Sequence, residues 1–205
     1  MARTFDVKKR GVTRRKQKPV YLLIAEGRNK TEVAYFSHFQ DQNRDYTLRI
    51  VKAGNNTDAY SLCKAVTMKW DELGLSEAQG DRAFIVLDMD DDEQKAGKIR
   101  DVIKRNKQKG IECVVSNPTF ELWFLLHFKY TTKHYIDGDA TIADLKKYIP
   151  NYEKNVDVFA LCEERMETAI QNAEKLDVNF EGEQWPSEKC NPRTDVGRLV
   201  DMLKR

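Results

Sequence analysis

Acidic residues follow directly on the most apolar stretch of the chain. Residues 83–87 are all apolar, and Asp88, Asp90, Asp91 and Asp92 come immediately after them. Carboxylates this close repel one another, so a cluster of this kind usually surrounds a cation or a developing positive charge. The acidic cluster at the end of a buried strand is therefore the first candidate for an active site.

The elements that must position this cluster follow from the hydrophobic period, which switches between strand-like and helix-like. Short apolar runs predict strands, and apolar residues three and four apart predict amphipathic helices. The predicted strands cover residues 20–25, 46–52, 82–87 and 111–116, and the helices between them cover 30–40, 59–73 and 93–109. Strands and helices that alternate over short connections predict right-handed crossovers and an α/β fold on a mostly parallel sheet.

Two strand ends bring carboxylates to the same edge of this sheet. In an open parallel sheet the functional crevice lies beyond the carboxyl ends of the strands. Glu26 ends the first predicted strand and Asp88 the third, so both should reach this crevice, and Asp90 can join them if the chain is still extended there. Three carboxylates without nitrogen or sulfur donors suit Mg²⁺ or Mn²⁺. Such an ion neutralises developing charge on a phosphodiester and lowers the pKa of attacking water.

Other acidic residues nearby have both a structural and a functional interpretation. Glu32 lies three residues after Asn29, which is the spacing of a capping box, so it is either a helix cap or a metal ligand. Asp91 and Asp92 lie in the first turn of a predicted helix, where the helix dipole favours negative charge.

Two Asn-Pro pairs have the sequence of helix starts. Asn117 with Pro118, and Asn191 with Pro192, predict an asparagine N-cap followed by proline at the first helical position. Glu121 lies one turn into the first of these helices, where it could be a fourth acidic participant in the crevice.

The strand–helix alternation stops after Ser116. Residues 119–128 are apolar nearly all round and predict a buried helix, and everything after Tyr130 is expected to be helices and loops, with one long helix over 159–173. We therefore expect a basic arm (1–18), an α/β core (19–129) and a helical C-terminal extension packed on that core (130–205).

The net charge of +2 conceals an asymmetry between the arm and the rest of the chain. Residues 1–18 contain eight basic residues and one acidic residue, a charge of +7, so the remaining residues carry −5. A basic arm on an acidic body is typical of polyanion binding, although a solvated tail has the same composition. The candidate nucleic-acid-binding residues are Arg10, Arg14, Arg15 and Lys16 in the arm, and Arg28, Lys30 and Lys95 near the crevice.

The composition also bounds the setting of the protein. The sequence has no apolar run of the roughly 20 residues that a membrane span needs, and its basic N-terminus lacks the apolar segment of a signal peptide. Its four cysteines form no C-x-x-C pair, which argues against a structural zinc site and a disulfide framework. We expect a cytoplasmic protein without membrane contact.

Together these residues resemble a known family. Glu26 with the following residues 27–32, and then Asp88-Met89-Asp90, look like the glutamate and the D-x-D motif of Toprim domains, which occur in topoisomerases, primases and OLD-type nucleases. Residues 116–118 and 120–123, and the Asn191-Pro192 pair before the last helix, are similar to the RloB-like family of small Toprim proteins.

The resemblance implies a three-layer Toprim fold and Mg²⁺-dependent nuclease chemistry on RNA, tRNA included, or DNA. It implies that Glu26 is the general acid/base and that Asp88 and Asp90 bind metal, with Asp91 and Asp92 competing for a third acidic position. RloB-like proteins resemble bacterial anti-phage defence and abortive-infection components. OLD-type nucleases carry an ATPase, whereas this chain has no G-x-x-x-x-G-K-[ST] loop, so an ATPase or sensor would be a separate partner. Assembly into a homo-oligomer stays open.

Two other classes of function compete with this interpretation. Leu87-Asp88-Met89-Asp90 also looks like the D-x-D loop of haloacid-dehalogenase phosphatases, but Asp92 stands where that loop has Thr or Val, and two strands precede it. The chain could instead be a non-catalytic nucleic-acid adaptor, whose acidic cluster is only a helix N-terminus and whose arm does the binding.

Overall fold

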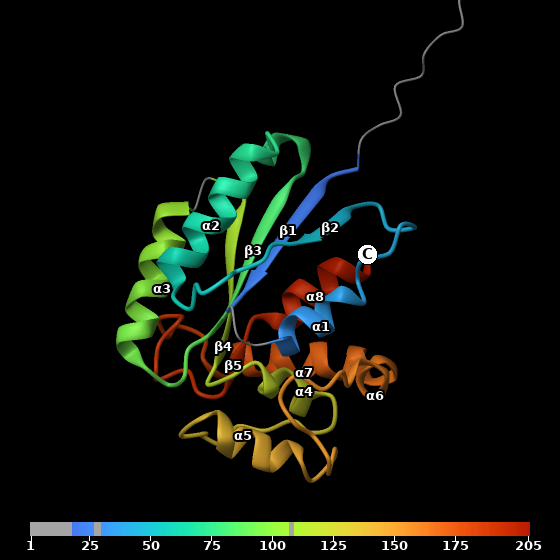
Figure 1. Cartoon of the computed structure of the whole chain (residues 1–205). Coiled ribbons are helices and arrows are strands. Elements are labelled where there is room, and N and C mark those ends of the chain that lie inside the picture. Colours follow the sequence, from blue (N-terminus) through green and yellow to red (C-terminus); the bar gives the residue numbers. More distant parts are fainter. Residues whose placement is uncertain (1–17, 27–29, 107–108) are drawn as a thin grey trace, which may run out of the picture.

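A five-stranded sheet forms the centre of the molecule (Figure 1). The computed structural model describes residues 18–26, 30–106 and 109–205. The strands are β1 (Val20–Ala25), β2 (Thr47–Ile50), β3 (Arg82–Asp88), β4 (Ile111–Asn117) and β5 (Arg193–Thr194), in the order β2-β1-β3-β4-β5. The first four run parallel, and β5 pairs antiparallel with β4. The mostly parallel α/β sheet expected from the sequence is confirmed.

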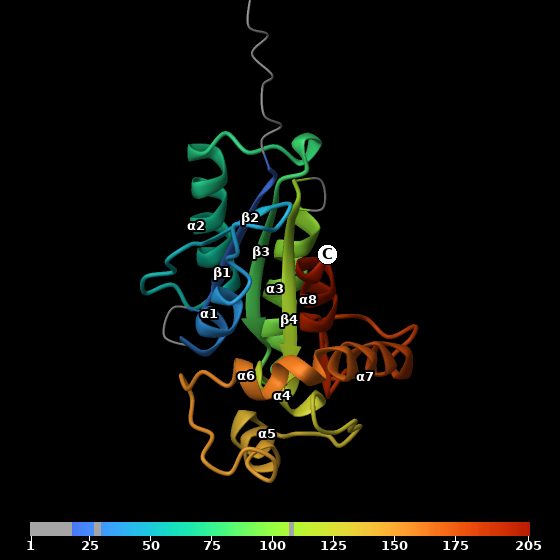
Figure 2. The same cartoon turned by 90° about the vertical axis from the view of Figure 1, so that its right-hand side faces the viewer.

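Helices cover both faces of the sheet. α2 (Ala59–Glu72) and α3 (Glu93–Asn106) pack on one face, and α1 (Lys30–Ser37) and α8 (Val196–Lys204) lie against the other, as Figures 1 and 2 show. Successive residues of a strand point to opposite faces. In β1, Leu22 therefore joins the core beneath α2 and α3, while Leu23 joins the core on the side of α1 and α8. Burial on both faces explains why these strands are continuous apolar runs.

One side-chain cap and one glycine mark the starts of α2 and β4. The Asp58 carboxylate accepts hydrogen bonds from the amides of Tyr60 and Ser61 at the start of α2. Gly110 adopts φ +63° immediately before β4, and a Cβ there would come within 3.3 Å of the Asp81 carbonyl oxygen. A left-handed turn this close to backbone favours glycine.

The remaining helices gather at the carboxyl end of the parallel strands (Figure 2). They are α4 (Glu121–Leu126), α5 (Gly138–Leu145), α6 (Phe159–Cys162), the 3₁₀ turn η2 (Glu163–Arg165) and α7 (Met166–Asn179). Every residue of α4 is buried, as expected for a helix whose residues are apolar except for Glu121. One hydrophobic cluster joins sheet residues such as Phe84 to α4, α7 and α8. Within the described ranges, no helix is both long and apolar enough to cross a membrane.

Three expectations for the C-terminal part are wrong. β5 is a strand where only helices and loops were expected, and it is held by an antiparallel register that pairs Thr194 with Ser116. The long helix predicted over 159–173 is divided into α6, η2 and α7. β5 has only two residues, too few to show the alternation of apolar and polar residues by which a strand is recognised in a sequence.

Neither Asn117 nor Asn191 caps a helix, which is the third error. Asn117 is the last residue of β4, and its side-chain amide donates to the Cys190 carbonyl oxygen at 3.1 Å. Asn191 pairs with Tyr135, accepting from its amide at 3.0 Å and donating to its carbonyl oxygen at 2.8 Å. Both asparagines precede cis prolines, and the helices after them begin later, at Glu121 and Val196. Their side chains fasten distant loops to one another instead.

Candidate active site

The first two carboxylates lie where the strand order reverses. β1 has β2 on one side and β3 on the other, so the β1–β3 boundary is the topological switch point at which α/β sheets bind ligands. Glu26 directly follows β1, and Asp88 is the last residue of β3. The register pairs Ala25 with Val86, so both carboxylates stand at the same edge of the sheet.

Asp88 is the most deeply placed of these acids. Its residue is 6% exposed, and its Oδ1 has no hydrogen-bond partner among the described residues. Burial raises the pKa of Asp88 well above its usual range, and the charges of Glu32, Glu121, Glu26 and Asp90 raise it further. All four carboxylates are therefore close enough to Asp88 to raise its pKa.

A hydroxyl links Asp88 to Glu121 at the start of α4. The Thr119 Oγ1 lies 3.0 Å from Asp88 Oδ2 and 2.5 Å from Glu121 Oε2. A hydroxyl has one hydrogen to donate, so one of the two carboxyl groups must supply the other hydrogen when both bonds form. The Tyr152 hydroxyl donates to the other oxygen of Glu121 at 3.0 Å.

Glu32 adds a further buried carboxylate from the first turn of α1. Its residue is 4% exposed, and its Oε2 has no hydrogen-bond partner in the part of the chain that is described. Burial raises the pKa of Glu32 to about 8, and the charges of Glu121 and Glu26 add to the effect. Asn29, the proposed capping-box partner of Glu32, lies outside the described residues. We refer to Glu26, Glu32, Asp88, Asp90 and Glu121 as the carboxylate cluster.

Lys95 of α3 bridges the outer part of the carboxylate cluster. Its Nζ lies 3.1 Å from Glu26 Oε1 and 2.7 Å from Asp90 Oδ2, and its side chain is 23% exposed. Burial lowers the pKa of Lys95, but the bond to Asp90 and the charge of Glu26 outweigh it, so the pKa is raised and the ammonium stays charged. Burial also raises the pKa of Glu26, and Lys95 offsets only part of this rise.

Asp90 reaches the cluster by a different route from the one expected. The chain is not extended there: Asp90 and Asp91 have φ angles of +55° and +54°, a left-handed turn that costs energy in residues other than glycine. The Asp90 side chain is 59% exposed and contacts the cluster through Lys95. Non-glycine residues in left-handed conformations cluster at active sites and ligand clamps.

The two neighbouring aspartates have structural partners. Asp92 caps α3, since its Oδ1 accepts from the amides of Gln94 at 2.7 Å and Lys95 at 3.2 Å. Asp91 is bonded by the Asn117 side-chain amide at 3.4 Å and lies 3.3 Å from His134 Nε2. Both residues therefore take part in holding the turn after β3.

Most of the predicted nucleic-acid-binding residues cannot be placed. Arg10, Arg14, Arg15, Lys16 and Arg28 lie outside the described residues, and of Lys30 only its position at the start of α1 is described. Lys95, the remaining member, is bound to carboxylates.

The carboxylate oxygens of the cluster are suitable ligands for a hard cation, but the described side chains are not arranged around a metal-binding position. Across residues 18–26, 30–106 and 109–205, no group of three or more His, Cys, Asp or Glu side chains is arranged to hold a metal ion. Lys95 provides the positive charge at Glu26 and Asp90, but Asp88 Oδ1 and Glu32 Oε2 remain buried without a donor. Unpartnered carboxylate oxygens of this kind match the ligands that Mg²⁺ and Mn²⁺ prefer.

Sequence reasoning missed the hydroxyl groups of the site. Thr119 stands two residues before Glu121, and this proximity is a signal that could have been used. Tyr152 lies 31 residues beyond Glu121, in a segment whose position depends on the packing of α5 and the following loop, so no local pattern indicates it.

Comparison with known proteins gives one match. Neither the curated proteins nor the solved structures include a match to this chain. A family model described as RloB-like protein matches residues 21–203, from the second residue of β1 to the penultimate residue of α8. The match covers almost every described residue, and the chain belongs to the RloB-like family.

Proposed function

We propose that the protein is a nuclease dependent on Mg²⁺ or Mn²⁺ that cleaves phosphodiester bonds of RNA, tRNA included, or DNA. The observation that carries this proposal is the carboxylate cluster at the switch point of the sheet, with buried oxygens that have no donor in the described part of the chain. The resemblance of Glu26 and Asp88-Met89-Asp90 to the Toprim motifs supports the same chemistry.

The energetics of the carboxylate cluster favour a functional role. Mutually repelling buried carboxylates destabilise a fold unless cations or hydrogen bonds offset the repulsion. No described Lys, Arg or His forms an ion pair with Asp88, Glu32 or Glu121. Groups whose pKa is shifted by burial and by one another, in the position where such sheets bind ligands, are typical of active sites.

The residues divide the chemistry between them. Asp88, Glu32 and Glu121 would hold the ion, with Thr119 and Tyr152 fixing the orientation of Glu121. When bound, the ion would supply charge neutralisation at the phosphate and a lower pKa for water. Glu26 is suited to proton transfer because its raised pKa lies closer to neutrality. Lys95 is suited to bind a substrate phosphate once Glu26 and Asp90 turn to other partners.

The biological setting belongs to the same proposal. The resemblance to defence-associated RloB-like proteins supports an anti-phage or abortive-infection role in the cytoplasm. A separate ATPase or sensor would then control cleavage, as the OLD-type nucleases suggest.

A cleavage assay tests the proposed function. The full chain is incubated with supercoiled plasmid, single-stranded DNA or total tRNA, each with Mg²⁺, Mn²⁺ or EDTA. We expect cleavage of at least one class with metal and none with EDTA. Asp88→Asn should be inactive, and Glu181→Gln, at an exposed acid on the loop after α7, should retain activity. Absence of cleavage in every arm would contradict the proposal.

A non-catalytic nucleic-acid adaptor is the second candidate. The capping role of Asp92 and the bridge from Lys95 to Glu26 and Asp90 favour it, because they give part of the acidic turn a structural purpose. An adaptor would bind the same nucleic acids equally well in EDTA and leave them intact.

A further inference from the structure

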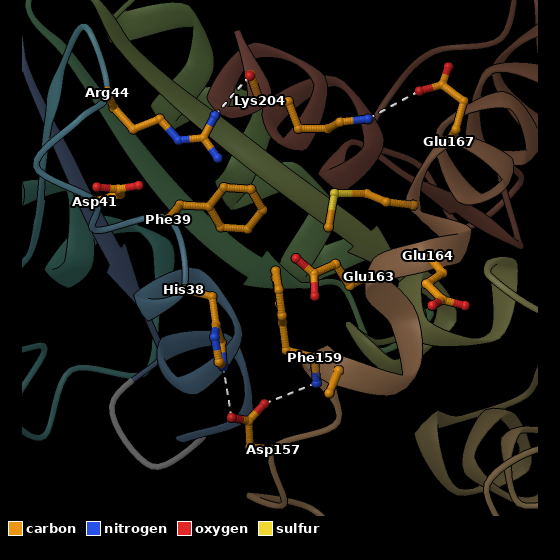
Figure 3. A pocket seen from close by; sticks show the side chains of 12 residues that line it. His38, Phe39, Asp41, Arg44, Asp157, Phe159, Glu163, Glu164, Glu167 and Lys204 are labelled. Atoms are coloured by element: carbon orange, nitrogen blue, oxygen red, sulfur yellow. Dashed lines mark hydrogen bonds and ion pairs between the residues drawn. The ribbon is translucent and has the colours of Figure 1, made fainter.

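A cavity lies outside the carboxylate cluster, between the end of α1, the α6–α7 segment and the end of α8 (Figure 3). Its volume is about 710 Å³, within the usual range of ligand-binding cavities. Phe39, Phe159 and Met166 give it an apolar floor. The His38 ring stacks on Phe159 with centroids 4.1 Å apart and planes at 10°, so part of the wall is a flat aromatic surface. Such surfaces accept guanidinium groups as well as apolar ones.

The rim of this cavity is acidic beyond what its own cations neutralise. The lining carboxylates are Asp41, Asp157, Glu163, Glu164 and Glu167, and the lining cations are Arg44 and Lys204. Asp157 pairs with His38 at 2.7 Å and Glu167 with Lys204 at 3.1 Å. Asp41, Glu163 and Glu164 form no ion pair with any described residue. In Figure 3 the Glu163 carboxylate and the Phe39 ring point toward the middle of the cavity.

The first described residue, Lys18, lies next to residues that line this cavity. Lys18 Nζ donates to the Gln42 carbonyl oxygen at 2.7 Å and to that of Arg44, which lines the cavity. A second hollow of about 290 Å³, lined in part by Lys18 and Gln42, shares Asp41 with the cavity. Lys18, where the described chain begins, therefore lies beside the acidic rim.

We propose that residues 1–17 bind in this cavity of their own chain, with their Arg and Lys side chains against Asp41, Glu163 and Glu164. The segment carries seven basic residues and one acidic residue, a charge of +6 that complements the rim. A chain of this length spans up to about 55 Å when fully extended. Attachment at Lys18 keeps the local concentration of the segment high, on the order of millimolar, so weak individual contacts suffice.

The docked arm would be withheld from nucleic acid. Basic side chains that pair with the rim cannot release counterions from phosphates at the same time. Binding of the arm to the cavity and binding of the arm to a polyanion thus exclude each other. The proposal concerns charge and shape alone and is independent of any reaction at the carboxylate cluster.

Chemical-shift mapping on the full chain tests the contact directly. Backbone amide spectra are compared between the unchanged protein and the variant K8Q/K9Q/R14Q/R15Q. We expect shifts at Asp41, Phe159, Glu163 and Glu164, independent of protein concentration, and none at Glu181 and Glu183. An absence of shifts at the cavity overturns the proposal. Shifts that disappear on dilution also overturn it, since the arm would then occupy the cavity of a second copy.

Proteolysis supplies a second readout with a matched control. Trypsin cleavage within residues 1–17 should become about three- to tenfold faster in E163K/E164K, the range expected from reversing two exposed charges. The control E181K/E183K reverses two exposed charges on the loop after α7 and should leave the rate unchanged. Equal rates in the two variants would overturn the proposal, and melting curves establish that both are folded.

Discussion

At the scale of single residues, the carboxylate cluster contains two kinds of acid. Glu26 and Asp90 share the ammonium of Lys95, whereas Asp88 and Glu32 retain buried oxygens without a donor among residues 18–26, 30–106 and 109–205. The ammonium of Lys95 already balances the charge of Glu26 and Asp90. A bound cation would therefore chiefly relieve the repulsion among the inner acids, Asp88 and Glu32. This difference separates the effects of substitutions at Asp88 and at Lys95.

Asp88→Asn should abolish cleavage and leave the free energy of unfolding unchanged or raised. The amide resembles the protonated carboxyl that burial already favours, and it removes repulsion without opening a cavity. Cleavage gels beside thermal melting curves measure both effects. A purely structural Asp88 would show the opposite result, with lowered melting temperature and retained activity.

Lys95→Gln should strengthen binding of Mn²⁺ alone by about tenfold, because the ammonium competes with the ion for the negative charge of the carboxylate cluster. Titration calorimetry or Mn²⁺ electron paramagnetic resonance measures the affinity without nucleic acid. Lys98→Gln, at an exposed lysine of the same helix, is the matched control and should bind Mn²⁺ as the unchanged protein does. Equal affinities in the two variants would show that Lys95 does not compete for the site.

Asp144 should make the free energy of unfolding decrease as the pH falls. Hydrogen bonds from Lys147 and Tyr135, together with Lys133, lower the pKa of this buried carboxyl to about 2. Its contribution to stability is therefore complete above the unfolded pKa near 4 and is lost as the pH falls toward 2. Asp144→Asn should lower the free energy of unfolding at pH 7 by roughly 1–2 kcal/mol. Urea melts from pH 7 to pH 2 should show this difference shrinking with acidification.

At the scale of elements, close helix packing holds the C-terminal part to the sheet. α7 and α8 cross at Gly197, where an added Cβ would lie 2.8 Å from the Ala173 Cβ and 3.5 Å from Trp123. No Cβ fits there without moving one helix. Glycine is required at this crossing by the approach of α7 and not by its backbone angles.

Gly197→Ala should destabilise the protein by roughly 1–3 kcal/mol, the cost of overpacking a core. Gly97→Ala is the matched control: Gly97 also lies in a helix, but a Cβ there meets only the end of Arg100 at 3.7 Å. It should stabilise by about 0.5–1 kcal/mol through helix propensity. Denaturant unfolding compares the two, and equal signs would contradict the packing argument.

At the scale of the whole molecule, one hydrophobic cluster connects the sheet to the C-terminal helices. Leu23 and Phe84 of the sheet belong to the same buried cluster as Trp123, Ile170 and Leu199. We therefore expect the C-terminal helices and the sheet to unfold together.

Leu199→Ala should therefore lower the stability of the entire chain by about 2–5 kcal/mol in a single transition. Tryptophan fluorescence, which reports on Trp70, Trp123 and Trp185 together, and far-ultraviolet circular dichroism should give coincident curves. An early separate transition would show that α8 unfolds independently of the sheet.

The sequence by itself determined the features that depend on local pattern. Apolar runs and helical periods predicted the four parallel strands and the helices between them, because burial on one or two faces imposes a period on neighbouring residues. The same periods placed Glu26 and Asp88 at strand ends and therefore at one edge of the sheet.

Only the tertiary structure decided how distant segments meet. Several features join residues that are far apart in the chain, and no local pattern predicts them. They are the pairing of β5, the partners of Asn117 and Asn191, the bridge from Lys95, and the hydroxyl contacts of Thr119 and Tyr152. Asparagine before proline has the same local sequence whether it caps a helix or fastens a loop. The packing of the C-terminal helices on the sheet selects between these outcomes. That packing depends on contacts between residues far apart in the sequence.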